Sequence, residues 1–289
     1  MSDWDDYRFV LAVHRAGTVR GAAKSLGVNH ATVSRRLGQL SGDPPLFERV
    51  RGGYQVTETG ALWVRAAEEM EGLVMASERR TRAQHVELSG PLRLSLPTTL
   101  SQTVLLKPIA EFIRLHPRIE LSVRTSMTFA DLDRSEADVV VRGAEQPGDH
   151  LVGRRLFRYG LCCYSAPDYL RQTPPEERRW LRYGLSLDPG WIARSPYPDA
   201  PIAWVSDDLM VLQRSAAAGY GMLRTACYLG DADPGLVRLP GARVEAAQPL
   251  WILTHPDLRA SPRVNQLMDW LGRALRDERE LLTGESSLS

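Results

Sequence analysis

Residues 17–40 read GTVRGAAKSLGVNHATVSRRLGQL, and this stretch decides the fold of the N-terminal part of the chain. Small apolar residues recur in it at helical spacing before a short turn, after which Asn29 can cap a second helix through its side-chain oxygen. Val33, Leu37 and Leu40 give that second helix a buried face. Two short helices joined by a tight turn predict a helix-turn-helix.

The other face of the second helix carries side chains that suit DNA. Hydroxyl, guanidinium and amide groups repeat along one stripe of it, where they would be exposed together. Arginine pairs with guanine, glutamine with adenine, and hydroxyl groups with either base or with phosphate. The sequence therefore predicts DNA contacts from Thr32, Arg35, Arg36 and Gln39, with His30 and Ser34 flanking the stripe.

The segments on either side complete this unit. We expect a first helix at residues 3–16, and Thr18 can cap the helix that follows it. Residues 46–57 alternate around a Gly-Gly pair, which predicts a hairpin with Arg49 and Arg51 near its tip. A polar helical face alone could be merely solvated, but turn, basic helix and basic hairpin in this order favour a winged helix-turn-helix that binds DNA.

The charge of the whole chain hides this basic segment. The 289 residues contain 36 Lys and Arg against 35 Asp and Glu, a formal net charge of +1. Between Arg15 and Arg51, however, seven basic residues face two acidic ones, a local excess of five. Such an excess is what binding to phosphates requires.

Composition bounds the class of protein. With 43% hydrophobic and 25% charged residues, the chain is neither disordered nor a membrane protein, and its length suggests about two domains. The acidic N-terminus lacks the features of a secretory signal, and no stretch approaches a membrane span. Cys162, Cys163 and Cys227 form neither a metal-ligand spacing nor a disulfide framework. We therefore expect a cytoplasmic protein.

Residues 58–87 lack proline and carry apolar side chains at steps of four and three residues, which predicts a long amphipathic helix. This helix could simply pack against a domain, but an isolated helix of this length needs a partner for its apolar stripe. The stripe consists of Leu62, Ala66, Met70, Leu73 and Ala76.

Beyond a hinge at residues 89–91, apolar strands alternate with helical segments, which predicts an α/β domain with a largely parallel sheet. Expected strands lie at 92–96, 119–124, 138–142, 160–164, 186–187, 203–205, 221–224 and 250–254. Expected helices run up to 116, near 129–135, and over 207–219 and 262–275. The last strand and helix return to the first half, so that a first lobe comprises about 90–160 and 255–289 and a second lobe about 161–254.

Ligands of open α/β sheets bind beyond the carboxyl ends of the strands, where helix N-termini present free N–H groups. Three hydroxyl residues follow the first strand and could hold a small carboxylate there, although simple helix capping is an equal alternative. A lone arginine at a strand end could pair with a carboxylate or with a neighbouring acid of the protein. The candidate ligand residues are Thr98, Thr99, Ser101, Thr125, Ser126, Arg142 and Ser206.

The N-terminal sixty residues resemble one family closely. FVLAV at 9–13, GTV at 17–19, AAKSLGVNHATVSRRL at 22–37, LFER at 46–49 and TETG at 57–60 are similar to the DNA-binding domain of LysR-type transcriptional regulators. The loop at 40–45 is shorter than in that family. The similarity continues through HP at 116–117, ADV at 137–139, SAP at 165–167 and AGYG at 218–221, which resemble the effector-binding domain of these regulators.

The resemblance implies three parts: a winged helix-turn-helix at 1–60, a linker helix at 58–87 that pairs with a second subunit, and a two-lobed effector domain at 90–289 like periplasmic binding proteins. It implies major-groove or phosphate contacts by His30, Thr32, Ser34, Arg35 and Arg36, and wing contacts by Arg49 and Arg51. It places the candidate ligand residues at a cleft between the lobes. The implied partners are promoter DNA, a small effector such as a carboxylate, a second copy of the chain in a dimer or a tetramer, and RNA polymerase.

Two other functions compete with ligand-controlled DNA binding. Some relatives sense oxidants through cysteines, so a thiol-based redox-sensing regulator is the alternative within the family, although adjacent Cys162 and Cys163 on an apolar strand are typical of core residues. An enzyme or a pure ligand-binding protein is the alternative on the two-lobed fold. The sequence shows no nucleophile elbow, zinc motif, P-loop or dinucleotide fingerprint, so we expect no catalytic residues, no metal and no cofactor.

Overall fold

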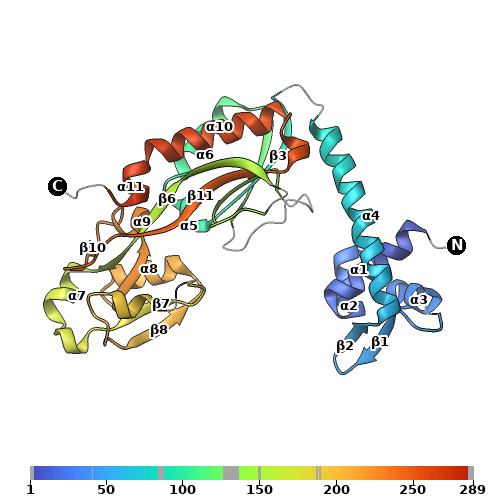
Figure 1. Ribbon diagram of the computed structural model, residues 1–289, viewed down its shortest axis with the longest axis horizontal. Coiled ribbons are helices and arrows are strands. Elements are labelled where there is room, and N and C mark those ends of the chain that lie inside the picture. The colour runs from blue at the N-terminus through green and yellow to red at the C-terminus, as the bar shows by residue number, and fades with distance from the viewer. Residues whose placement is uncertain are drawn as a thin grey trace. The chain divides into compact units, whose positions relative to one another are not determined.

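The computed structural model describes residues 3–40, 42–83, 88–125, 137–148, 151–186, 188 and 190–285. It divides the chain into two compact units, Met1–Arg79 and Arg80–Ser289, which are described one at a time. Figure 1 shows the elements of both. Within the described residues, no helix has both the length and the apolar character needed to cross a bilayer.

The first unit begins with three helices, α1 (Trp4–Ala16), α2 (Val19–Leu26) and α3 (His30–Leu40), and each begins at a local capping contact. The caps of α2 and α3 are those that the sequence predicts. Asp3 and Asp6 form a capping box on α1, and the Thr18 hydroxyl accepts a hydrogen bond from the Gly21 amide at the start of α2. Asn29 accepts from the Ala31 amide at 2.9 Å. The predicted helix-turn-helix is confirmed.

A hairpin and a long helix complete the first unit. Strands β1 (Phe47–Val50) and β2 (Gly53–Val56) pair so that Val50 lies opposite Gly53. The hairpin is held to the turn between α1 and α2, since the Tyr54 amide donates to the Gly17 carbonyl oxygen at 2.8 Å. The contact is so close that a Cβ on Gly53 would lie 2.1 Å from that oxygen. Helix α4 follows over Glu58–Ala83; residues 84–87 of the expected linker helix lie outside the described residues.

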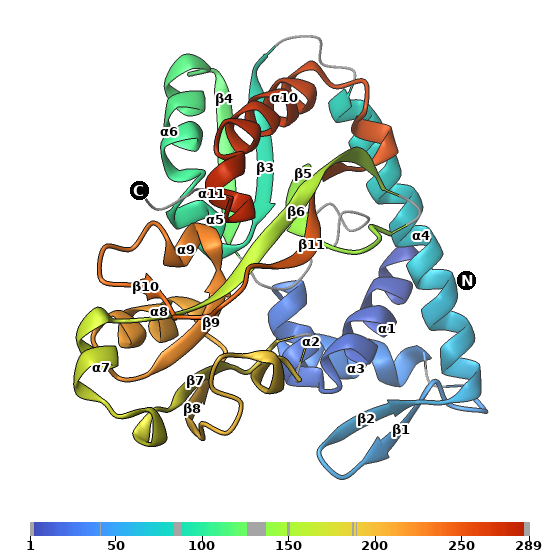
Figure 2. The same ribbon diagram turned by 60° about the vertical axis from the view of Figure 1, so that its left-hand side comes forward.

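Among its described residues, the second unit is built on one sheet of nine strands. In the first lobe β3 (Gly90–Leu96), β4 (Ile119–Thr125) and β5 (Val139–Gly143) run parallel, and in the second lobe β7 (Trp180–Tyr183), β8 (Ile202–Ser206) and β9 (Met222–Ala226) do so. Between them β6 (Val152–Ser165) and β11 (Glu245–Thr254) run antiparallel to each other, and Figure 2 shows both strands passing from one lobe to the other. The sheet is therefore mixed, and the expectation of a largely parallel sheet is correct only within each lobe.

The remaining elements surround this sheet. The helices are α5 (Thr98–Gln102), α6 (Leu106–Leu115), α7 (Pro167–Gln172), α8 (Leu209–Ala217), α9 (Cys227–Gly230), α10 (Pro262–Asp277) and α11 (Arg279–Thr283). Single 3-10 turns lie at Pro175–Glu177, Trp191–Arg194 and Pro256–Leu258, and the short strand β10 at Val237–Arg238 pairs with β6.

Each lobe has its own core. In the first lobe β3 side chains such as Leu94 pack with Phe112 of α6 and Leu267 of α10, all essentially buried. In the second lobe one face of the sheet packs on α8, and the other face packs Trp180 against Trp191 with ring centroids 4.8 Å apart. Helix α10 thus packs in the same core as β3 and α6.

Several expected elements differ from the structure. The strand expected at 186–187 is wrong: the strand is β7, and the Ser186 hydroxyl lies in a turn, where it accepts a hydrogen bond from the Asp188 amide. The helix expected up to 116 is two helices, α5 and α6. Strand β11 already pairs with β5 from Leu250, so the chain re-enters the first lobe before the expected boundary at 254. The helix expected near 129–135 and residue 187 lie outside the described residues.

Candidate nucleic-acid interface and ligand site

The outer face of α3 is exposed as the sequence predicts. His30, Ser34, Arg35 and Gln39 are exposed on it, and Thr32 is half-buried, while Val33 and Leu37 on the other face are buried in the core of the unit. Arg35 has no hydrogen bond or ion pair with any described residue. Its guanidinium is thus available to a partner outside the unit.

Arg36 has a different environment from its neighbour. Its Nη1 donates to Asp6 Oδ1 of α1 at 2.9 Å, and its guanidinium carbon lies 5.9 Å from the centroid of the Phe9 ring. The Asp6 side chain is only 10% exposed and also accepts a hydrogen bond from the Asp3 amide. This ion pair braces α3 against α1, which the sequence stripe alone does not show.

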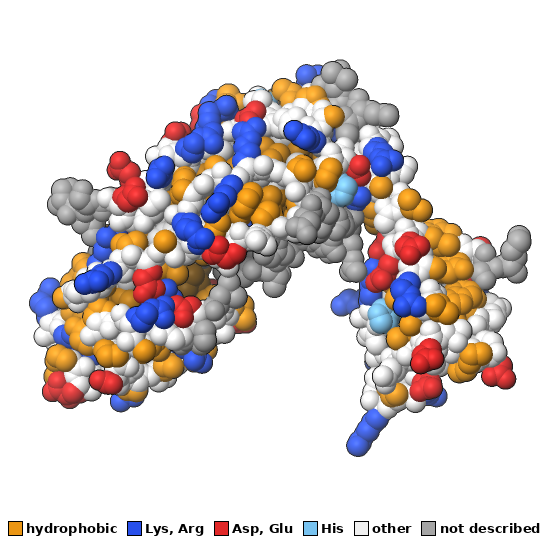
Figure 3. All heavy atoms as spheres, viewed as in Figure 1, with side chains coloured by type: hydrophobic (Ala, Val, Ile, Leu, Met, Phe, Trp, Pro, Cys, Tyr) orange, Lys and Arg blue, Asp and Glu red, His pale blue; other side chains and the backbone are white. Residues whose placement is uncertain are grey.

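Two of the seven basic residues between Arg15 and Arg51 are paired with acids that lie outside that segment. Arg15 makes two hydrogen bonds to the Glu71 carboxylate of α4, at 2.9 and 2.6 Å, and Arg36 is held by Asp6. The other five basic residues are exposed, and none has an ion pair with a described residue. They are Arg20, Lys24, Arg35, Arg49 and Arg51. Arg51 and Gly52 form the turn of the β1–β2 hairpin, and Figure 3 shows a basic side chain projecting at the lower end of this unit.

Helix α4 has two different faces. Its first turns are fixed to the unit, since Val64 and Ala67 are buried with Val10, and Trp63 stacks on Tyr7 at a centroid distance of 4.7 Å. The predicted apolar stripe turns outward, with Leu62 59% exposed and Leu73 72% exposed. Met70 and the neighbouring Val74 are exposed too, and Ala66 and Ala76 are half-buried.

Candidate ligand residues of the first lobe gather at the carboxyl ends of its parallel strands. Thr125 ends β4 directly beside Leu96, the last residue of β3, and is exposed. Thr98 and Thr99 begin α5 just after β3, and the N-cap of that helix is Pro97, which makes no side-chain cap. The alternative that these hydroxyls merely cap the helix is therefore wrong.

The hydroxyl groups of α5 differ in what they contact. The Thr99 hydroxyl lies 2.9 Å from the Tyr228 hydroxyl of α9, and both side chains are buried. Burial raises the pKa of Tyr228, so this phenol stays protonated and can donate to a neighbour. Ser101 donates to the Thr98 carbonyl oxygen at 2.8 Å, a bond within the helix. Tyr228 was missed because sequence reasoning considered only the ends of the strands.

Arg142 lies near the end of β5 and is only 3% exposed. Its Nη2 donates to the Ser95 hydroxyl of β3 at 3.1 Å, and desolvation lowers the pKa of the guanidinium to about 10. The cation remains charged at neutral pH. An anion that reached it would meet a strongly desolvated charge.

The two remaining candidate ligand residues are Ser206 and Ser126. Ser206 ends β8 in the second lobe, where its hydroxyl accepts from the Asp208 amide at 3.1 Å. Ser126 lies outside the described residues. Among the residues that the structure describes, no group of His, Cys, Asp and Glu side chains could hold a metal ion.

The three cysteines are buried and free. Burial is the main reason that the pKa of Cys163 rises to about 12 and that of Cys227 to about 11, and the pKa of Cys162 is raised as well. A reactive thiol needs a lowered pKa and access to solvent. These environments therefore favour core roles over oxidant sensing.

Each of the two units is similar to a domain of known proteins. A family model described as a bacterial regulatory helix-turn-helix protein of the lysR family matches residues 4–61, and one described as the LysR substrate binding domain matches residues 85–276. The Mau operon transcriptional activator of Paracoccus denitrificans is 26% identical over 282 residues, covering 93% of this chain and 95% of that protein. The transcriptional regulator YhjC of Escherichia coli is 24% identical, covering 89% of this chain and 92% of that protein.

Solved structures show the same fold. The full-length virulence activator AphB of Vibrio cholerae is 18% identical with a TM-score of 0.59, covering 93% of this chain and 98% of that one. The LysR-type regulator CrgA of Neisseria meningitidis is 21% identical with a TM-score of 0.55, covering 96% and 99%. Full-length OxyR of Pseudomonas aeruginosa, at 14% identity and a TM-score of 0.57, covers 96% of this chain and 95% of that one.

Proposed function

Because the chain belongs to the LysR family of transcriptional regulators, with a helix-turn-helix DNA-binding domain and an effector-binding domain, we propose which of its residues do this work. The outer face of α3 enters the major groove and the β1–β2 hairpin tip lies against phosphates or the minor groove. The supporting observation is the set of five exposed basic side chains without ion pairs among the described residues. The proposed contacts are His30, Thr32, Ser34, Arg35, Gln39, Arg49 and Arg51. Arg36 orients α3 through Asp6.

Regulators of this family bind DNA as oligomers, and we propose that the outward stripe of α4 pairs with the same stripe of a second copy. The exposure of Leu62 and Leu73 supports this, since a helix with such a stripe gains stability by covering it. A twofold dimer of this kind matches operator half-sites about 34 Å apart or multiples of that spacing. A tetramer built from two such dimers, and contact with RNA polymerase, are further proposals of the same model.

For the effector, we propose a small carboxylate at the carboxyl ends of β3, β4 and β5. Arg142 supplies the charge, and the hydroxyl groups of Thr98, Thr99 and Thr125 supply hydrogen bonds. Ser206 completes the site from the other lobe, and Ser101 supports α5. Ser126 stays a candidate from the sequence alone. Because β6 and β11 connect the lobes, a ligand that draws the lobes together changes the geometry presented to DNA.

We propose a regulatory and not a catalytic role, in the cytoplasm, since the matched family models and the named relatives describe regulators. DNA binding is tested with a duplex carrying the sequence upstream of the protein's own coding region. Arg35→Ala and Arg51→Ala should each weaken binding while leaving the fold intact, because neither side chain has a described partner inside the protein. Wild-type affinity in both variants would refute the assignment of this face.

The effector site is tested separately. In the full-length protein, a metabolite screen by thermal shift should find carboxylates that raise the melting temperature, because a ligand selective for the folded state stabilises it. Thr99→Val and Thr125→Val should reduce that shift. A carboxylate hit whose shift is the same in both variants would place its site elsewhere.

A further inference from the structure

The second lobe contains a cavity of about 420 Å3 that none of the candidate ligand residues lines. Residues of strands β6 and β9 line it, together with residues 191, 194–196 and 241–245. This volume lies in the range of small-molecule sites in proteins. Trp191, Pro196 and Val244 contribute apolar side chains to the lining.

Arginine dominates the charged side chains of the lining. Arg194, Arg224 and Arg243 line it together with a single acid, Glu245, and the nearby Asp188 offsets one more positive charge. One cation therefore remains in excess. Arg243 is exposed and has no ion pair with a described residue.

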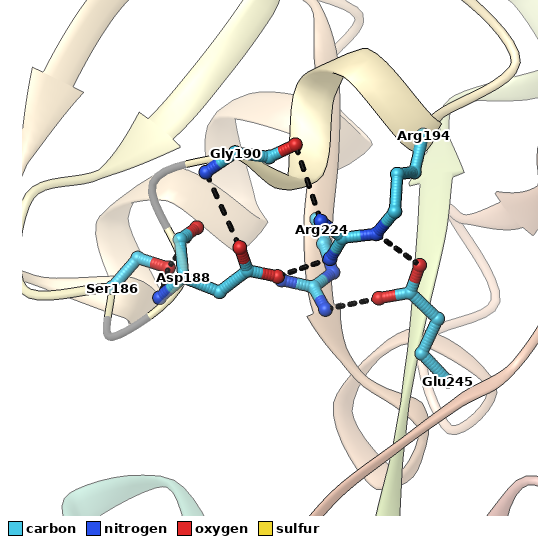
Figure 4. Close-up of polar contacts among 6 residues, drawn as sticks. All are labelled: Ser186, Asp188, Gly190, Arg194, Arg224 and Glu245. Carbon is cyan, nitrogen blue, oxygen red and sulfur yellow. Dashed lines mark hydrogen bonds and ion pairs between the residues drawn. The ribbon is translucent and has the colours of Figure 1, made fainter.

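Four of these groups form a ring, which Figure 4 shows. Arg224 is bonded to Glu245 and lies 3.6 Å from the Asp188 carboxylate, while Arg194 is bonded to Asp188 and lies 3.6 Å from the Glu245 carboxylate. The Arg224 side chain is only 10% exposed, and its guanidinium carbon lies 5.6 Å from the centroid of the Trp191 ring. Two guanidinium groups are thus held in place between two carboxylates of the chain itself, of which Glu245 also lines the cavity.

We propose that this cavity binds a small organic monocarboxylate, whose carboxylate group replaces that of Glu245 on Arg194 and Arg224 and whose apolar body packs on Trp191 and Val244. The Glu245 side chain is 36% exposed, so it can leave the ring for solvent without burying its charge. Arg243 then neutralises the added anion. A planar carboxylate suits this arrangement because guanidinium groups bind it with two parallel hydrogen bonds.

The site is separate from the effector site proposed for the first lobe, and it gives the ligand a route to the rest of the protein. Glu245 is the first residue of β11 and pairs with Leu161 of β6, where both strands pass between the lobes. Release of Glu245 from Arg224 breaks the ion pair that links this end of β11 to β9. A carboxylate in the cavity therefore acts on the connection between the lobes.

The experiment uses the full-length protein and a panel of sodium propionate, 3-methylbutanoate, benzoate and phenylacetate, with benzamide as the uncharged counterpart of benzoate. Binding is measured by saturation-transfer NMR and by calorimetry at concentrations up to roughly 10 mM. At least one carboxylate should bind and benzamide should not. Arg194→Gln and Arg243→Gln should each raise the Kd on the order of tenfold. Glu245→Gln should lower it, because the competing carboxylate is gone.

Arg259→Gln, an exposed arginine of the first lobe, is the matched control and should bind as the wild type does. Circular dichroism melting of each variant separates loss of a contact from loss of the fold. The proposal is overturned if no panel member binds either the wild type or Glu245→Gln. It is overturned equally if binding survives Arg194→Gln and Arg243→Gln but is lost in Thr99→Val and Thr125→Val, because the ligand then sits in the first lobe and supports only the effector site proposed there.

Discussion

Replacing Arg35 or Arg36 by alanine removes one guanidinium group from α3 in either case. We expect Arg36→Ala to lower mainly the stability of the fold and Arg35→Ala to lower mainly the affinity for DNA. Arg35 is exposed and has no described partner, so its loss should leave the free energy of unfolding within about 0.5 kcal/mol of the wild type. Arg36 holds the poorly exposed Asp6 carboxylate of α1 at 2.9 Å and covers the Phe9 ring. Arg36→Ala should therefore lower the free energy of unfolding, by about 1–2 kcal/mol since the Arg36 side chain is itself one-third exposed.

For DNA affinity we expect the opposite order, with the larger loss in Arg35→Ala. A guanidinium group that contacts a base or a phosphate is worth about 1–3 kcal/mol, so Arg35→Ala should weaken binding between about fivefold and more than a hundredfold. If the contact is to phosphate, the slope of log K against log salt concentration should fall by about 0.9. Arg36→Ala should cost less than about 1 kcal/mol of binding, through the looser attachment of α3.

Both quantities are measurable on the same preparations. Fluorescence anisotropy with the upstream duplex at several salt concentrations gives affinity and slope, and urea unfolding gives stability. Asp6→Asn is the matched control, because it breaks the ion pair without removing a cation from α3; it should reproduce the stability loss and bind DNA nearly as the wild type does. The reasoning is refuted if Arg36→Ala unfolds like the wild type while its binding falls as far as that of Arg35→Ala.

Three further outcomes follow from the structure. Gly53→Ala should destabilise the first unit by about 2 kcal/mol or more in urea unfolding, because the added Cβ would clash with the Gly17 carbonyl oxygen. Gly72→Ala on α4 should stabilise the unit by about 0.5–1 kcal/mol, because the added Cβ meets no atom there and alanine favours a helix more than glycine does. Leu73→Asp should raise the dimer dissociation constant on the order of a hundredfold or more in sedimentation equilibrium, because two copies lose an apolar contact; an unchanged dimer would contradict the proposed interface. The pKa of Cys163 is about 12, so its thiol stays protonated at pH 7–8, and peroxide at that pH should leave DNA binding unchanged. The protonated thiol contributes stability to the folded state that is full below about pH 9 and is lost as the pH rises towards 12. DNA binding that changes on oxidation would support the redox-sensing alternative.

The parts of the fold that the sequence predicts correctly rest on contacts between near neighbours. The predicted caps by Thr18 and Asn29 join residues three and two positions apart, so residue type and spacing suffice to place them. Ion pairs such as Arg36 with Asp6 and Arg15 with Glu71 join residues 30 and 56 positions apart. Whether a given arginine faces DNA or an acid depends on how the helices pack, which the stripe on α3 does not encode.

In the second unit, strands that depend on a distant pairing partner are likewise not predictable from the local sequence. The prediction found only the apolar end of β6, because Arg154, Arg155 and Arg158 make its first half resemble a surface loop. That half is a strand since β11 pairs with it along one side, a partner nearly one hundred residues away. The candidate ligand residues at the strand ends were predictable from topology, but Tyr228 and the Arg224 ring depend on side chains from separate elements and became visible only in the structure.

The passage of β6 and β11 between the lobes has a consequence for synthesis of the protein. The first lobe takes β3 to β5 from one part of the chain and β11 with α10 from another, and the whole second lobe is inserted between them. On the ribosome the inserted lobe can close its core while the older first lobe still lacks Leu267 and Leu271. The lobe that is started first is therefore finished last, and until α10 emerges the apolar sheet face that this helix covers stays exposed, which favours aggregation.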